Sequence, residues 1–207
     1  MKRHTCLSRL LPLTLAAALL TVPAAAFRDT SGHWAEQTLN AWQAQGFLDG
    51  YGGGTCQPDG PMTRAGFAKL MNRAMGFTAE APITFTDVGE DDWFHTEAAR
   101  AVAAGYAQGS GGMFLPRQNV TRAQAAAMLA RAAGLTADEA KADGFTDAAS
   151  LPAWAKGSIG AAADAGLMSG YADGTFRADG LITRAQAVVT LDRLMKHTRD
   201  TAKDPAG

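Results

Sequence analysis

The chain has 207 residues, a formal net charge of −1 and 19% charged residues. This nearly neutral balance argues against nucleic-acid binding, which requires a strongly basic surface. The length is ample for one hydrophobic core, so the fold needs no disulfide to be stable.

Residues 1–26 are predicted to form an export signal peptide. Three basic residues precede an apolar core at 10–22, and small residues at 23–26 form a cleavage site. The apolar run is shorter than the roughly 20 residues of a membrane span. Cleavage would leave 19 − 3 = 16 basic residues against 20 acidic ones, a charge of 16 − 20 = −4. We therefore expect an exported and mildly acidic mature protein.

The remaining sequence contains three copies of one unit, at residues 27–77, 85–135 and 145–195. Each copy opens with Phe-x-Asp, carries a tryptophan and then two glycines four residues apart, and closes with Thr-Arg-Ala. In chain order these residues are Asp29, Asp87 and Asp147; Trp34, Trp93 and Trp154; the second glycines Gly50, Gly109 and Gly170; and Arg64, Arg122 and Arg184. Matched sets at a spacing of about 60 residues identify internal repeats.

Each copy is predicted to form two helices joined by a glycine-rich loop. Apolar residues recur at helical spacing after each tryptophan, for instance Leu39, Trp42 and Phe47. The first glycine of each pair, such as Gly46, suits the left-handed backbone that ends many helices. One helix pair cannot bury its apolar face alone, so the three copies should pack into a single body. We expect a mainly α fold with little strand, ending in a flexible tail at 196–207.

The second helix of each copy is expected to begin at a threonine: Thr63, Thr121 or Thr183. In the last two copies a glutamine follows three residues later, a capping-box pattern in which both side chains satisfy helix-start amides. Gly66 holds this position in the first copy, so that helix start should be weaker. In the third loop, the Asp-Gly pair at 173–174 predicts a tight turn between short extended segments.

The three arginines require a counter-anion. Arg64, Arg122 and Arg184 fall in the first turn of a predicted helix, where the helix dipole disfavours a cation by roughly 0.3 kcal/mol or more. One candidate anion is structural, the aspartate of a Phe-x-Asp element in a bidentate salt bridge. The other is a carboxylate or phosphate of a ligand, held by the guanidinium and the helix-start amides. The residues alone do not separate these two alternatives.

The tryptophans and aspartates of the repeats also have two interpretations each. A tryptophan here packs in the core, which the large area it buries favours, or it offers a flat face to a sugar ring. An aspartate caps the helix that follows it or accepts hydrogen bonds from sugar hydroxyls. These two roles of the aspartate are compatible.

Cys56 would be the single thiol of the mature chain. An odd cysteine in an exported protein indicates a free thiol or a disulfide-linked homodimer. Its glycine-rich loop gives no sign of the environment that lowers a catalytic thiol pKa. The sequence also lacks a His-Glu-x-x-His zinc motif and a nucleophile elbow. We therefore expect a protein that is not an enzyme, without catalytic residues, metal or cofactor.

Taken together, these motifs resemble the S-layer homology family. Its repeats open with Phe-x-Asp, carry a tryptophan, pass through Gly-Tyr-x-Asp-Gly-Thr-Phe-x-Pro and enter the last helix at Ile-Thr-Arg-Ala-Glu. The likeness covers residues 27–194 and is closest at 170–176. The resemblance implies a pseudo-threefold body whose inter-repeat grooves bind an acidic cell-wall glycan, pyruvylated or phosphate-bearing, or a peptidoglycan-linked polymer. It also implies non-covalent attachment at the cell wall or cell surface.

The resemblance assigns ligand binding to the arginine, aspartate, tryptophan and second-glycine sets, and favours a ligand as the arginine counter-anion. The copies depart from the family pattern, because the final Glu is Gly66, Gln124 or Gln186 and the first loop has Cys56 in place of Phe. We therefore expect unequal grooves, with those of Arg184 and Arg122 as the leading candidates. The alternative function is an envelope assembly module that binds another protein without glycan; a wall-acting enzyme is less favoured.

Overall fold

The computed structural model describes residues 26–203, so the predicted signal peptide lies outside the described residues except for Ala26. The helices are α1 (Glu36–Ala44), α2 (Arg64–Met75), α3 (His95–Ala103), α4 (Arg122–Ala132), η1 (Ala140–Gly144), η2 (Ala148–Ser150), α5 (Ala153–Asp164) and α6 (Arg184–Lys203). Isolated β-bridges replace strands in this part of the chain. The prediction of a mainly α fold with short extended segments is confirmed. No helix between residues 26 and 203 is long and apolar enough to cross a membrane.

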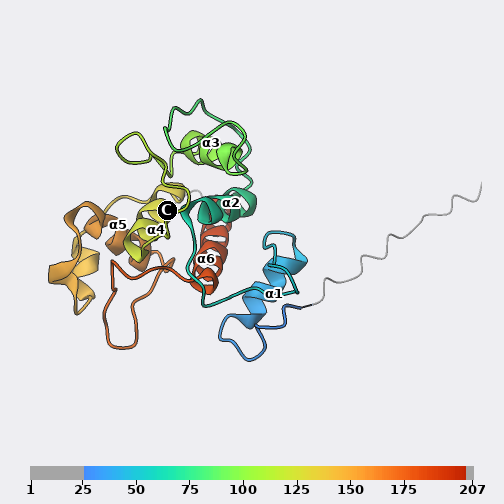
Figure 1. Cartoon of the computed structure of the whole chain (residues 1–207). Helices are drawn as coiled ribbons and strands as arrows, with labels where there is room; N and C mark the ends of the chain where they lie inside the picture. The colour runs from blue at the N-terminus through green and yellow to red at the C-terminus, as the bar shows by residue number, and fades with distance from the viewer. Residues whose placement is uncertain (1–25, 204–207) are drawn as a thin grey trace, which may run out of the picture.

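Each first helix packs against the second helix of the preceding copy. Helix α3 contacts α2, α5 contacts α4, and α1 contacts α6, so the pairing runs from the last copy back to the first. The second helices lie together, with α6 touching both α2 and α4. Figure 1 shows α1, α3 and α5 lying in three different directions around α2, α4 and α6. The three copies thus share one body.

A cyclic set of hydrogen bonds joins the segments that lead into the second helices. The Met62 N–H donates to the Ile182 carbonyl oxygen (3.1 Å), the Ile182 N–H to that of Val120 (2.9 Å), and the Val120 N–H to that of Met62 (2.8 Å). The three side chains are buried. This ring is the pattern that a pseudo-threefold arrangement requires, and it supports the expected arrangement of the copies.

The second helices begin at the predicted threonines. In each copy the threonine Oγ1 accepts the N–H of the residue three positions later, at 3.2 Å. Gln124 and Gln186 return the bond by accepting the N–H groups of Thr121 and Thr183, at 3.1 and 3.3 Å. Both capping boxes are therefore confirmed. In the first copy, Gly66 has no side chain to return the bond, so α2 begins without the reciprocal hydrogen bond.

Replacing Thr121 by Ala should lower the free energy of unfolding by about 1 kcal/mol, because the Gln124 N–H loses its acceptor at the start of α4. Urea denaturation followed by circular dichroism measures the change. Thr136→Ala, at an exposed position in the link between copies, is the control and should be nearly neutral. Equal losses in the two variants would show that the cap contributes nothing particular.

Two local predictions are confirmed and one is wrong. Gly46, which ends the first helix, has the expected left-handed φ of 74°. Gly174 has a φ of 79° and donates its N–H to the Tyr171 carbonyl oxygen at 2.9 Å, as a tight turn requires. The tail, however, is not frayed from residue 196, because α6 continues to Lys203. An i,i+4 ion pair of Lys196 with Asp192 at 2.8 Å supports this extension.

Candidate functional site

The aspartates of the Phe-x-Asp elements fix the loops of their own copies. Each carboxylate accepts two consecutive backbone N–H groups at 2.7 to 2.8 Å. The second donor has left-handed backbone in every copy, although none of the three is glycine. These residues are Gln57 (φ 53°), Leu115 (φ 60°) and Arg177 (φ 56°). Such a backbone is strained for a side-chain-bearing residue, so the carboxylate holds a conformation the loop would otherwise leave.

The aspartates therefore do not perform the helix-capping role that the sequence suggested. The first helices α1 and α3 begin at Ala35 and Phe94 without a side-chain cap. Burial raises the pKa of Asp29 and Asp147, but the backbone amide bonds outweigh it and hold each pKa below its ordinary value. A carboxylate whose pKa is lowered by folding stabilises the fold fully at any pH above its pKa in the unfolded chain. This stabilisation is lost as the pH falls through its lower pKa in the folded protein.

The salt bridges proposed between these aspartates and the repeat arginines are not present among residues 26–203. Instead, the guanidinium of Arg122 donates from Nε to the Phe176 carbonyl oxygen at 2.7 Å and from Nη2 to that of Ser169 at 2.8 Å. The guanidinium also lies over the rings of Tyr171 and Phe176, 4.7 and 4.6 Å from their centroids. Carbonyl oxygens and ring faces thus supply the negative potential that was expected from a counter-anion of the arginine.

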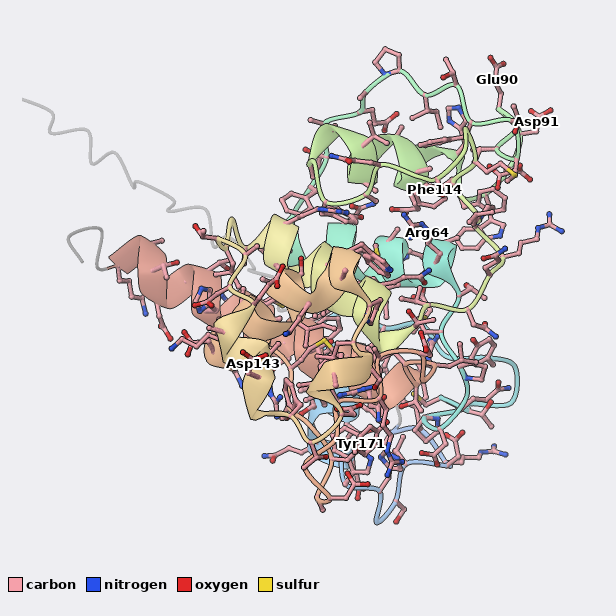
Figure 2. The ribbon with its side chains drawn as sticks, turned by 90° about the vertical axis from the view of Figure 1, so that its left-hand side faces the viewer. Arg64, Glu90, Asp91, Phe114, Asp143 and Tyr171 are labelled. Atoms are coloured by element: carbon pink, nitrogen blue, oxygen red, sulfur yellow. The ribbon has the colours of Figure 1, made fainter. Side chains whose placement is uncertain are left out.

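Arg184 and Arg64 occupy equivalent positions with fewer partners. Arg184 donates to the Asp49 carbonyl oxygen and, at 3.4 Å, to the Tyr51 hydroxyl. Its guanidinium lies over the Tyr51 ring, 4.8 Å from the centroid. Arg64 lies over the Phe114 ring at 5.1 Å. The buried Nε atoms of Arg64 and Arg184 both lack a hydrogen-bond partner. Figure 2 shows Arg64 and Phe114 close together at one side of the body.

Three grooves with corresponding linings lie between the copies. We name each by its arginine: the Arg64 groove, the Arg184 groove and the Arg122 groove, with volumes of about 360, 270 and 170 Å³. Each takes its arginine from one copy, its glycine loop and second helix from the next, and its tryptophan from the third. The predicted members are Arg64, Gly109 and Trp154; Arg184, Gly50 and Trp93; and Arg122, Gly170 and Trp34. The three aspartates line none of these grooves.

The tryptophans at the grooves are exposed, so the expectation that they pack in the core is wrong. Trp34, Trp93 and Trp154 are 60 to 64% exposed. Each belongs to the start of a first helix that packs on the preceding copy, and this docking carries its ring to the edge of the neighbouring groove. The buried tryptophan is Trp42, which donates from Nε1 to Asp192 at 3.1 Å.

The groove glycines have a structural reason to lack a side chain. A Cβ at Gly50 would lie 2.6 Å from the ring of Phe27, and one at Gly170 would lie 2.9 Å from Phe145. The phenylalanine of each Phe-x-Asp element thus packs directly under the loop that lines the groove. A close approach of backbone to aromatic ring explains why glycine recurs here in every copy.

The grooves hold a second cation that was not predicted from the sequence. Arg131 lines the Arg64 groove and Arg193 lines the Arg122 groove, nine residues after the predicted arginines Arg122 and Arg184. The equivalent residue of the first copy is Arg73, nine residues after Arg64. This periodicity was available in the sequence. Arg73 itself pairs with Asp49, a carboxylate at the edge of the Arg184 groove, at 2.7 Å.

Cys56 is completely buried, which gives no support to the suggested disulfide-linked homodimer. Its thiol occupies the core position of Phe114 and Phe176 in the other copies, directly after the loop. Burial raises its pKa, although the nearby Arg184 acts in the opposite direction. A buried thiol with a raised pKa is a packing group and a poor nucleophile.

Comparison with known proteins agrees with this repeat structure. The pattern of the S-layer homology domain matches residues 26–68, 84–126 and 144–188. The chain is 29% identical over 197 residues to the Surface-layer 125 kDa protein of Lysinibacillus sphaericus (91% of this chain, 17% of that protein). It is 35% identical over 108 residues to the Surface layer protein of Brevibacillus choshinensis (48% and 9%). It is 25% identical over 179 residues to the Exoglucanase XynX of Acetivibrio thermocellus (84% and 16%).

The chain thus spans at most 17% of the length of these relatives. Two of the three are surface-layer proteins, which supports a role in anchoring at the cell surface. The third is an enzyme, but the match runs through its S-layer homology region, a cell-wall anchoring module. Because the three domain matches coincide with the three structural copies, the chain belongs to the S-layer homology family.

Proposed function

We propose that the chain anchors its bearer non-covalently to the bacterial cell envelope by binding an acidic cell-wall glycan in the three inter-repeat grooves. The observation that carries this proposal is the shared composition of the grooves. Each combines an arginine and an exposed tryptophan with a glycine loop, drawn from all three copies. Family membership supports a cell-wall polymer as the partner.

Each part of a groove suits one part of such a ligand. An exposed indole offers an apolar face on which a sugar ring can stack, and a sugar presents an apolar C–H face to it. The guanidinium provides a positively charged fork for a carboxylate or phosphate oxygen. The glycine lets a sugar approach the loop backbone closely. Exposed aromatic surface rimmed by polar groups is typical of ligand-binding grooves.

The pairing of residues from different copies also favours a ligand over a purely structural role. A tryptophan that is 60% exposed gains little from burial, so its repeated placement at a cationic groove has no packing explanation. A second protein could cover the same aromatic faces, which is the assembly alternative. The wall glycan is favoured because every groove also holds a cation suited to an acidic substituent.

Replacing Trp34, Trp93 and Trp154 together by alanine should reduce binding to protein-free sacculi by roughly 100-fold, because three stacking contacts are lost. Co-sedimentation of the purified chain measures the affinity. The fold should persist, since these side chains are mainly exposed. Met113→Ala, at an exposed apolar residue outside the three grooves, is the matched control and should bind like the unchanged protein.

A second arm of this experiment tests the acidic chemistry. Sacculi stripped of their acidic polymer should no longer sediment the chain. Undiminished binding to stripped sacculi would rule out the polymer as partner, and absence of binding to intact sacculi would favour the protein-assembly alternative.

A further inference from the structure

The three grooves have corresponding linings but different free charge. The arginines and the second cations come from equivalent helix positions, whereas the residue before the groove glycine differs: Asp49 in the first copy, Gln108 in the second and Ser169 in the third. Only the first of these is ionisable. The balance between fixed cations and built-in acceptors therefore differs from groove to groove.

In the Arg122 groove the guanidinium is already satisfied. Arg122 is 5% exposed, is bonded to two carbonyl oxygens and lies over two aromatic rings. The second cation, Arg193, donates to the Ser169 hydroxyl at 3.3 Å. This groove is also the smallest of the three. An acidic ligand would meet one accessible arginine here.

In the Arg184 groove the carboxylate of Asp49 pairs with the groove cation Lys69 and with the neighbouring Arg73. Asp49 Oδ2 lies 3.0 Å from Lys69 Nζ and 2.7 Å from Arg73 Nη1. Burial raises the pKa of Asp49, but the hydrogen bonds from these two cations outweigh it and hold the pKa below its ordinary value. The carboxylate is therefore ionised at neutral pH and stays paired. An acidic group of a ligand would therefore have to compete with Asp49 for Lys69.

The Arg64 groove has two arginines and no lining carboxylate. Arg64 and Arg131 both line it. The buried Nε of Arg64 has no partner, a property it shares with Arg184 Nε, so these two grooves differ in the lining carboxylate and not in this atom. Ser110 stands where the other two loops have Tyr51 and Tyr171, so no tyrosine ring covers Arg64. Burial first, and then the charge of Arg131, lower the pKa of Arg64. Two like charges at a partly buried groove are costly to hold together without an anion.

We propose that the Arg64 groove is the principal acid-binding groove of this chain, and that Asp49 weakens the binding of acidic ligands in the Arg184 groove by pairing with Lys69 and Arg73. The inference rests on the proposed glycan-binding function and specifies which groove performs it. It reverses the ranking that motif quality suggested, which placed Arg184 and Arg122 first. Asp49 is then a specificity residue, because it repels the acidic group that the neighbouring cations would attract.

The exposed tryptophans provide one reporter for each groove. Titrating the ¹⁵N-labelled chain with a disaccharide that carries one pyruvate ketal should move the indole N–H signal of Trp154 first. The signals of Trp93 and Trp34 should move at concentrations at least about tenfold higher, reflecting the loss of one charge-assisted hydrogen bond. Buried Trp42 is the internal reference. A phosphorylated disaccharide in a parallel titration distinguishes the two acidic groups, and the uncharged parent sugar should move none of the signals at these concentrations.

Three variants make the test specific. Arg131→Gln should weaken the response of Trp154 by about tenfold or more. Arg193→Gln, at the equivalent helix position in the Arg122 groove, should leave Trp154 unaffected. Asp49→Asn should bring the Trp93 response to within a few-fold of that of Trp154, because Lys69 and Arg73 are released. All three side chains lie at the groove surface, so the circular dichroism spectrum should not change.

The outcomes separate this inference from the proposed function. A wild-type response that begins at Trp34 or Trp93, or a Trp93 signal that stays fixed in the Asp49→Asn variant, overturns the inference while leaving glycan binding intact. Polymer-dependent binding to sacculi without movement of any indole signal by either acidic disaccharide overturns the assignment of the acidic group to these grooves. Absence of binding to intact sacculi overturns both.

Discussion

Gly160→Ala is expected to lower the free energy of unfolding by about 3 kcal/mol, although glycine-to-alanine changes inside helices normally stabilise by about 0.5 to 1 kcal/mol. Gly160 lies within α5, and a Cβ there would overlap the carbonyl oxygen of Asp138. One turn earlier, Gly157 accepts the Asp138 N–H at 3.0 Å. The segment before η1 thus lies directly on this face of α5, and neither backbone can move away without losing the other's contacts.

Urea denaturation measures the loss, and Gly144→Ala provides the control. Gly144 has an ordinary negative φ and open space where a Cβ would be, so its replacement should stay within about 0.5 kcal/mol of the original stability. Because α5 also carries Trp154 into the Arg64 groove, the Gly160 variant should bind sacculi more weakly at temperatures near its midpoint. A stabilising effect at Gly160 would contradict the close packing of α5 on residues 137–138.

Asp87→Ala is expected to lower the free energy of unfolding by about 2 to 3 kcal/mol, which is the second large effect. The substitution removes the acceptor of two consecutive amides, those of Phe114 and Leu115, at 2.7 and 2.8 Å. Hydrogen bonds to a charged group contribute about 1.5 to 3 kcal/mol each, and exposure of the loop reduces that figure. Leu115 would also lose the contact that holds its left-handed backbone. Phe114, which lies beside Arg64, would lose its fixed position.

Thermal denaturation together with the Trp154 indole signal measures both consequences. Asp87→Asn keeps one acceptor oxygen and should lose about half as much stability. Asp91→Ala removes a nearby carboxylate that is exposed on an outer loop (Figure 2) and should be nearly neutral. If Asp87→Ala were as neutral as Asp91→Ala, the loop would be held by other contacts.

The parts of the fold that depend on local chemistry could be predicted from the sequence. Threonine caps, the left-handed Gly46 and the Asp-Gly turn at 173–174 are each determined by neighbours within a few residues. Repetition then identified the groove residues, since arginine, glycine and tryptophan recur in every copy. The same comparison would have found Arg131 and Arg193, which recur at a fixed distance from the predicted arginines.

The other features of the fold and of the grooves depend on contacts between copies, which the spacing of residues in the sequence does not reveal. Whether Trp154 is buried is decided by how α5 docks on α4, and the docking leaves the indole at the surface. The role of Asp87 depends on two amides in its own loop that show no side-chain signal. Asp49 could not be predicted from the repeats, because the equivalent residues of the other two copies are Gln108 and Ser169.

The pairing of α1 with α6 has a consequence for how the chain reaches its native state. The indole of Trp42 and the carboxylate of Asp192 that it binds are 150 residues apart. Contacts of such high sequence separation form late and slow the folding of a domain. If the chain is delivered from its N-terminus, α3 can meet α2 and α5 can meet α4 in sequence, whereas α1 must wait for α6. The first copy synthesised is therefore the last to be completed.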